Sequence, residues 1–147
     1  MGSQQSDESL GYRLHDLMHD VAKQLLVSVP SPTSHHQLPG LGLTMPEAHN
    51  QFLNRYRRQL QDGLWHTVTS DVYIHAHLTW HLEKAGQIET IHQLLQETTE
   101  SGRNGWYTAC DELGMVGSFV TDVARAWGLA ESIFETSPWS LANLGPK

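Results

Sequence analysis

The segment that decides the fold is residues 71–86, DVYIHAHLTWHLEKAG. Its apolar residues recur every three or four positions, which is the spacing of one face of an α-helix. Ser70 or Asp71 can cap the first free backbone N–H groups, and Gly86 is typical of a helix stop. We therefore expect a helix through Ala85 that is packed on two sides and is central to the fold. One face carries Ile74, Leu78 and Leu82, and the other carries Tyr73, Ala76 and Trp80.

Four further helices are predicted around this segment. Residues 88–95 have the spacing of a partner helix, close enough in sequence to pack antiparallel as a helical hairpin. Pro46 suits the first turn of a helix that carries apolar residues as far as Leu60 and ends before Gly63. A short helix is expected around residues 106–113. The last and longest amphipathic run consists of Val116, Phe119, Val120, Val123, Ala124, Trp127 and Ile133.

The fold class predicted from these patterns is all-α, because strand-like alternation is nearly absent. We expect a helical bundle built from helical hairpins, solenoid-like in its pairing, although one hairpin does not establish a repeat period. Proline and glycine divide the chain further. The expected parts are residues 1–27, ending in a helix from about Leu17 to Val27, a linker at 28–45, a helical body at 46–135, and a flexible tail at 136–147.

Composition excludes several classes of protein. The chain has 147 residues, and its nine Lys and Arg against sixteen Asp and Glu leave a formal net charge of −7, which argues against nucleic-acid binding. No apolar run approaches the roughly 20 residues that span a bilayer, so no membrane association is expected. Cys110 is the single cysteine, which excludes an intramolecular disulfide and favours a reducing compartment, the cytoplasm.

Ten histidines raise the question of a metal site. His77 and His81 are four residues apart, so a helix could direct both imidazoles at one ion. Zinc needs three or four ligands, however, and His75 points roughly 200° away from His77 around a helix. We predict no metal ligands. His77 and His81 are instead expected to lie half-buried beside Leu78 and Leu82, each bonded to a backbone carbonyl or to water.

The sequence carries no signature of catalysis. It has no Gly-x-Ser-x-Gly elbow and no Gly-Lys pair, so neither a serine nucleophile nor a phosphate-binding P-loop is present. The charges of Asp111 and Glu112 are expected to raise the pKa of the adjacent Cys110 thiol and make it unreactive. We expect no enzymatic activity from this chain alone.

One short motif is more specific. Residues 12–20, YRLHDLMHD, resemble the His-Asp signature that closes the winged-helix part of NB-ARC, or STAND, signalling NTPases. The resemblance implies that Leu14, His15, Asp16 and Leu17 form the motif and that residues 1–27 are a short winged-helix remnant. It also implies that His15 contacts the β-phosphate of ADP in a full-length parent, while Asp16 anchors the turn. A hydrogen-bond donor just before a helix N-terminus favours anion binding, because the helix dipole is positive at that end.

The remaining chain resembles the helical domain of the apoptotic protease-activating factor family. The resemblance is carried by residues 52–56, Trp65, residues 71–82, Ala85-Gly86 and Leu94-Leu95, among which Tyr73, His77, Leu78, Trp80, His81 and Leu82 form the structural motif. It implies a connector that relays the nucleotide state to a C-terminal, WD-repeat sensor. The resemblance implies that the full-length parent binds ADP or ATP with Mg, whereas this chain, a fragment of that parent, binds no cofactor. The implied partners are the nucleotide-binding and repeat domains of the parent, with homo-oligomers on activation.

Two alternatives remain open. A free-standing tetratricopeptide-like adaptor would bind a peptide in a helical groove and would need an exposed concave surface. A histidine-dependent metalloprotein would require metal bound by the purified chain.

Overall fold

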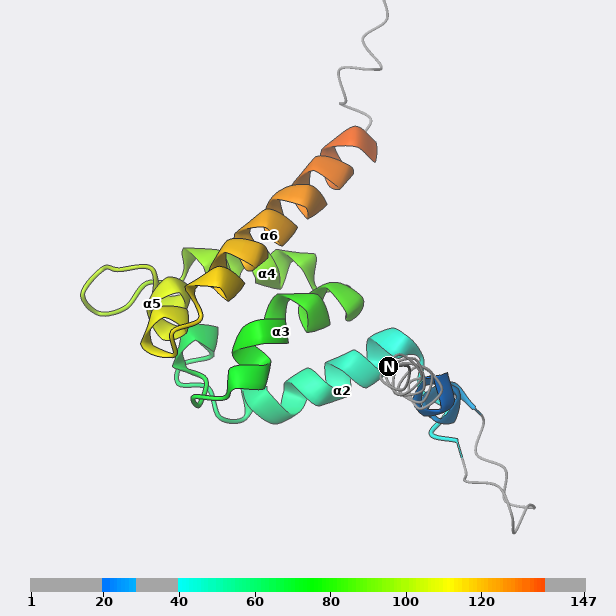
Figure 1. Cartoon of the computed structure of the whole chain (residues 1–147). Helices are drawn as coiled ribbons and strands as arrows, with labels where there is room; N and C mark the ends of the chain where they lie inside the picture. The colour runs from blue at the N-terminus through cyan, green and yellow to red at the C-terminus, as the bar shows by residue number, and fades with distance from the viewer. Residues whose placement is uncertain (1–19, 29–39, 137–147) are drawn as a thin grey trace, which may run out of the picture. The chain divides into compact units, whose positions relative to one another are not determined.

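A computed structural model describes residues 20–28 and 40–136 of the chain (Figure 1). The chain divides between Ala48 and His49 into two compact units, which are described separately. Every regular element within the described residues is a helix, which confirms the predicted all-α class. Two isolated β-bridges, Gln61 with Leu64 and Thr98 with Asn104, hold short loops. None of the described helices has the length and hydropathy that crossing a bilayer requires.

The first unit contains a helix whose last carbonyls are covered by the returning chain. Residues 20–27 are helical, whereas the start of the helix expected at Leu17 and the predicted winged-helix remnant before it lie outside the described residues. Leu41 and Leu43 donate backbone hydrogen bonds of 2.9 and 2.8 Å to the carbonyls of Leu25 and Leu26. The last carbonyl groups of a helix have no N–H donor within the helix, and these two bonds supply donors to them.

Helix α2 spans Met45–Arg57 and begins with a reciprocal cap. The Thr44 backbone N–H donates to Glu47 Oε2 at 2.8 Å, and the Glu47 N–H donates back to Thr44 Oγ1 at 3.3 Å. This Thr-x-x-Glu pairing is a capping box. The predicted extension to Leu60 is wrong, because the chain leaves the helix at Arg57 and turns through Asp62 and Gly63, whose φ angles are 50° and 76°.

Helices α3, Val72–Lys84, and α4, Ile88–Gln96, form the predicted hairpin. The Asp71 side chain caps α3 by accepting a hydrogen bond from the Tyr73 N–H at 2.8 Å. Gly86 ends the hairpin turn with a φ of +74°, a conformation that glycine adopts without steric cost. Both the capping residue and the stop residue of this central helix therefore agree with the prediction.

The 3-10 turn η1, Trp65–Thr67, connects α2 to α3, and two helices follow α4. Helix α5 spans Gly105–Glu112, and helix α6 spans Val116–Thr136. The Asn104 side chain caps α5 by accepting from the Tyr107 N–H at 2.8 Å. Figure 1 shows α6 crossing beside α4 and then projecting past the other helices of the second unit.

The core of the second unit lies where α3, α4, α5 and α6 meet. Helix α3 is central, but the face opposite Ile74 is not the predicted apolar one. Tyr73 and Trp80 remain 48% and 36% exposed, whereas His75, Thr79 and His81 are buried. Polar side chains thus occupy the second buried face of α3. The buried core residues are Leu53, Trp65, Val68, Ile74, Leu78, Leu82, Ala85, Ile91, Leu94, Trp106, Cys110 and Ala126.

Candidate functional site

A group of aromatic and imidazole rings joins α2 to α3. We call His49, Phe52, Tyr73, Trp80 and His81 the imidazole cluster. The Nδ1 atoms of His49 and His81 lie 2.8 Å apart, and Tyr73 Oη lies 3.1 Å from His81 Nε2. Phe52 stacks on the His81 ring, and Trp80 meets the His49 ring edge-on, with centroids 4.2 and 5.0 Å apart. The cluster therefore holds two helices together through polar and aromatic contacts at once.

At least one of the two imidazoles must be neutral at Nδ1 for the contact to form. A hydrogen bond between two Nδ1 atoms needs a proton on one nitrogen and a lone pair on the other. Burial, followed by the charges of nearby His49 and His77, lowers the pKa of His81 to about 4. Burial, followed by the charge of Lys84, also lowers the pKa of His49. Both side chains are accordingly uncharged at neutral pH.

The environment of the histidines differs from the expected one. His81 is buried, and its ring bonds to the side chains of His49 and Tyr73, not to a carbonyl or water. His77 is exposed and lies against the Tyr73 ring at 4.8 Å. Residues 77 and 81 lie roughly 40° apart around the helix, and it is His81, one turn later, that contacts His49 and Phe52 of α2.

A second polar site lies where α3, α5 and α6 meet, and sequence reasoning missed it. Asp122 on α6 is 2% exposed, and its Oδ2 accepts a 2.8 Å hydrogen bond from Trp106 Nε1. Its Oδ1 accepts a hydrogen bond from the Thr79 hydroxyl on α3. Burial raises the pKa of Asp122. Because each carboxyl oxygen already has a donor, this side chain acts as a clamp between three helices.

Next to this clamp, His75 of α3 packs against Trp106 of α5. Its ring stacks on the Trp106 indole with centroids 5.0 Å apart and planes 8° from parallel. Its Nδ1 lies 2.8 Å from the Asp71 carbonyl, one turn earlier in α3. Sequence periodicity could have placed His75 beside Thr79, but not against Trp106.

Glu97 forms a third polar site at the end of α4. Its carboxylate accepts hydrogen bonds of 2.9 Å from the backbone N–H groups of Trp65 and His66, and its Oε2 lies 2.8 Å from His66 Nδ1. Gly105 packs so closely on His66 that an added Cβ would lie 2.6 Å from the ring. Glu97 therefore fixes the η1 turn against the start of α5.

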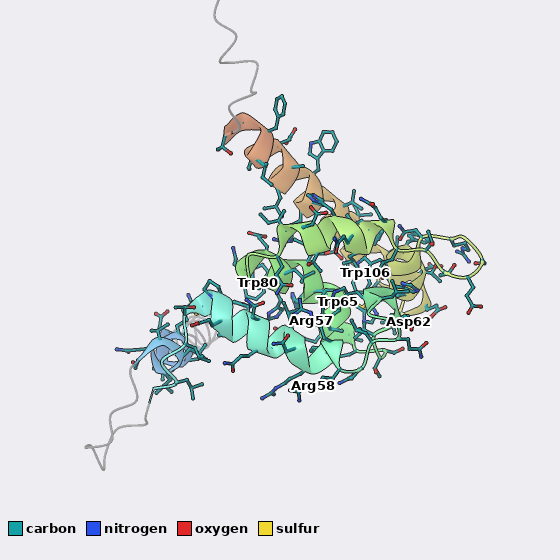
Figure 2. All side chains as sticks on the ribbon, turned by 180° about the vertical axis from the view of Figure 1, so that it is seen from behind. Arg57, Arg58, Asp62, Trp65, Trp80 and Trp106 are labelled. Atoms are coloured by element: carbon teal, nitrogen blue, oxygen red, sulfur yellow. The ribbon has the colours of Figure 1, made fainter. Side chains whose placement is uncertain are left out.

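A polar chain also ties α2 to the hairpin turn. Arg57 lies 5.6 Å above the Trp65 ring (Figure 2) and donates a hydrogen bond to Gln87. Gln87 in turn donates to Asn50, whose side-chain nitrogen donates to the Ala85 carbonyl at 3.3 Å. These bonds fix α2 to the turn between α3 and α4.

The chemical capacity of these sites is limited. Burial raises the pKa of Cys110 to about 12, so its thiol is not a nucleophile at neutral pH. The raised pKa agrees with expectation, although burial, followed by the charge of Asp122, is the cause and the adjacent acidic residues are not. Among residues 20–28 and 40–136, no group of three His, Cys, Asp or Glu side chains is placed to hold a metal ion.

The helical body can now be compared with known proteins. Residues 45–99 match the APAF-1 helical domain. The match runs from the first residue of α2 to the loop after α4 and covers less than half of the chain. No curated protein and no solved structure matches the chain. The predicted resemblance to this helical domain is thus confirmed over residues 45–99.

The APAF-1 helical domain match contains the imidazole cluster, the Asp71 cap, Glu97 and the Arg57 chain. Of the predicted structural motif, Leu78 and Leu82 are fully buried, while Tyr73 and Trp80 are partly exposed members of the imidazole cluster. The four residues of the predicted phosphate-sensing motif, Leu14, His15, Asp16 and Leu17, lie outside the described residues.

Proposed function

We propose that this chain is the non-catalytic helical connector of a STAND, or NB-ARC, signalling ATPase. In this proposal it relays the ADP or ATP state of a nucleotide-binding core to a C-terminal sensor, a WD-repeat domain. The observation that carries the proposal is the match of residues 45–99 to the APAF-1 helical domain. The nucleotides and Mg belong to the parent protein, which we place in the cytoplasm, and the connector binds no cofactor itself.

A relay must move as one body, and the polar contacts between helices support this property. The imidazole cluster joins α2 to α3, and Asp122 joins α3, α5 and α6. A buried polar contact with all its groups satisfied resists sliding, because displacement would leave donors without acceptors. The second unit is therefore suited to transmit a displacement from its first helix to its last.

The motif at residues 12–20 supplies the nucleotide-dependent part of the proposal. In the parent, His15 would contact the β-phosphate of ADP and hold the closed state, with Asp16 anchoring the turn. Loss of this contact would favour the active state, in which homo-oligomers form, since a ligand shifts an equilibrium only through differential affinity.

The test uses the full-length parent protein. We expect bound ADP in the purified wild type and a dissociation constant about tenfold to a hundredfold higher for His15→Ala, because a charge-assisted bond is lost. His77→Ala is the matched control, since His77 is exposed on α3 and should leave ADP affinity unchanged. An open reading frame without a P-loop upstream of this chain, or equal dissociation constants, would contradict the proposal.

A further inference from the structure

Helix α6 exposes a second apolar face, apart from the one that packs on the rest of the second unit. Its residues Val120, Val123, Trp127, Ala130 and Phe134, which we call the α6 seam, follow one another at intervals of three and four. The Trp127 and Phe134 side chains are 68% and 53% exposed. The amphipathic run predicted for this helix contained residues of both faces, with Phe119 on one and Val120, Val123 and Trp127 on the other. The face that actually packs on the body carries Phe119, Asp122, Ala126 and Leu129.

The spacing of the α6 seam is that of a coiled coil. Alternating intervals of three and four are the a and d positions of a heptad, which form a narrow apolar stripe. A single solvent-facing valine or tryptophan needs no explanation, but a continuous stripe over four turns does. The C-terminal part of α6 projects past the other helices of the second unit (Figure 1), and the seam's large side chains are exposed.

A hollow of about 380 Å³ lies on this seam. Four of its lining residues, Trp127, Ala130, Glu131 and Phe134, stand at positions i, i+3, i+4 and i+7, and Glu135 completes its edge. In helix pairing, a side chain of one helix inserts between four residues of its partner. The hollow therefore has the arrangement that receives an apolar side chain from another helix.

Charge selects the kind of helix that can enter. Glu131 and Glu135 border the hollow, and Arg125, the basic residue of α6, forms an ion pair with Glu83 on α3. In a parallel pair, a second copy of α6 would bring carboxylates to carboxylates, and in either orientation that helix has no free basic group to meet them. A helix with Lys or Arg beside its apolar stripe would place opposite charges at the rim instead.

We propose that the α6 seam binds an amphipathic helix of a partner protein, with apolar residues at heptad spacing flanked by lysine or arginine. An apolar side chain of that helix fills the hollow between Trp127 and Phe134, and its basic residues pair with Glu131 and Glu135. This binding site lies outside the match to the APAF-1 helical domain and does not depend on the proposed relay function.

The experiment uses the complete 147-residue chain and a synthetic probe. The probe is a peptide of about three heptads with Leu at a and d and Lys at e and g, and a second peptide carries Glu at e and g. Amide chemical shifts of the isotope-labelled chain report binding. We expect the Lys peptide to perturb α6, to bind more tightly than the Glu peptide, and to lose affinity with added salt.

Two double variants, each with a control, separate the apolar and charged contributions. Trp127→Ser with Phe134→Ser should weaken the Lys peptide about tenfold or more, because aromatic anchors dominate such interfaces. Val72→Ser, at a 64% exposed position on α3, should leave the affinity for the Lys peptide unchanged. Glu131→Lys with Glu135→Lys should reverse the preference between peptides. The same charge change at exposed Asp111 and Glu112 should leave that preference as it is.

Several results would overturn the proposal. One is failure of the Lys peptide to bind, and another is equal binding by the wild type and the Trp127→Ser, Phe134→Ser variant. Concentration-dependent dimers of the wild type that disappear in this variant, measured by sedimentation, would assign the seam to a second copy instead. The circular dichroism of the variants checks that they fold, which their exposed positions favour.

Discussion

The Nδ1 atoms of His49 and His81 face each other at 2.8 Å in the contact between α2 and α3. One imidazole donates and the other accepts, so the pair tolerates no second proton between the rings. Aromatic rings of Phe52 and Trp80 enclose it. The contact is therefore lost when both rings are protonated, and burial of the pair disfavours the charged form of each ring.

Stability should fall in mild acid because of this pair. An unfolded histidine titrates near 6.5, whereas burial lowers the pKa of His81 to about 4 in the folded chain. Between these values the unfolded chain binds more protons, so the free energy of unfolding decreases as the pH falls from about 7 toward 4. His81 alone should contribute a loss of about 2 kcal/mol by pH 5.

Urea unfolding at pH 7 and pH 5 measures this loss. The difference between the two pH values should shrink in His81→Gln and stay the same in His77→Gln, whose side chain is exposed. Identical pH dependence in the wild type and His81→Gln would show that the pair is not the source of acid sensitivity.

The carboxylate of Asp122 should be among the costliest polar groups to remove. Asp122→Ala leaves Trp106 Nε1 and the Thr79 hydroxyl without their acceptor in a buried site, and we expect a loss of about 2 to 4 kcal/mol. Asp122→Asn keeps one acceptor and should cost less. Denaturant midpoints test the order, with exposed Asp111→Ala as the control. A neutral Asp122→Ala would contradict the role of the clamp.

Truncations on α3 should separate its two faces. Leu82 is fully buried, so Leu82→Ala should destabilise by about 2 to 5 kcal/mol. Trp80→Ala should cost less than Leu82→Ala, because the indole is 36% exposed and belongs to the imidazole cluster, outside the apolar core. Thermal or urea unfolding of the two variants gives the comparison, and a larger effect at Trp80 would mean that the cluster contributes more than the apolar core.

Gly105 provides a test of close packing between η1 and α5. A Cβ there would lie 2.6 Å from the His66 ring, which the bond to Glu97 holds in place, so Gly105→Ala should cost about 1 to 3 kcal/mol. Gly128→Ala in α6 meets no atom within 4 Å and should be neutral or stabilising by about 0.5 to 1 kcal/mol. Equal melting temperatures of both variants would refute the packing argument.

Local features of this chain were predictable because they depend on neighbours in sequence. Asp71 caps α3 through a bond to Tyr73, two residues away, and Gly86 supplies a positive φ at the next turn. The spacing of Ile74, Leu78 and Leu82 places all three on one helix face whatever surrounds it. The helices, their order and the all-α class follow from such short-range rules.

The polar contacts depended on tertiary packing and could not be read from periodicity. His81 bonds to His49, 32 residues earlier, and Thr79 bonds to Asp122, 43 residues later. An Asp within an amphipathic run reads as solvent-exposed, yet Asp122 is buried because α5 and α3 offer donors to both of its oxygens.

The same reason explains why the amphipathic run of α6 left its buried face undecided. Val120, Val123 and Trp127 share the spacing of a core stripe, but Phe119, Asp122 and Ala126 are the residues that meet α3, α4 and α5. Sequence determined that α6 is a helix with apolar residues on more than one side. Only the packed structure decided which side is buried, since that choice depends on the shape and polar donors of the helices already in place.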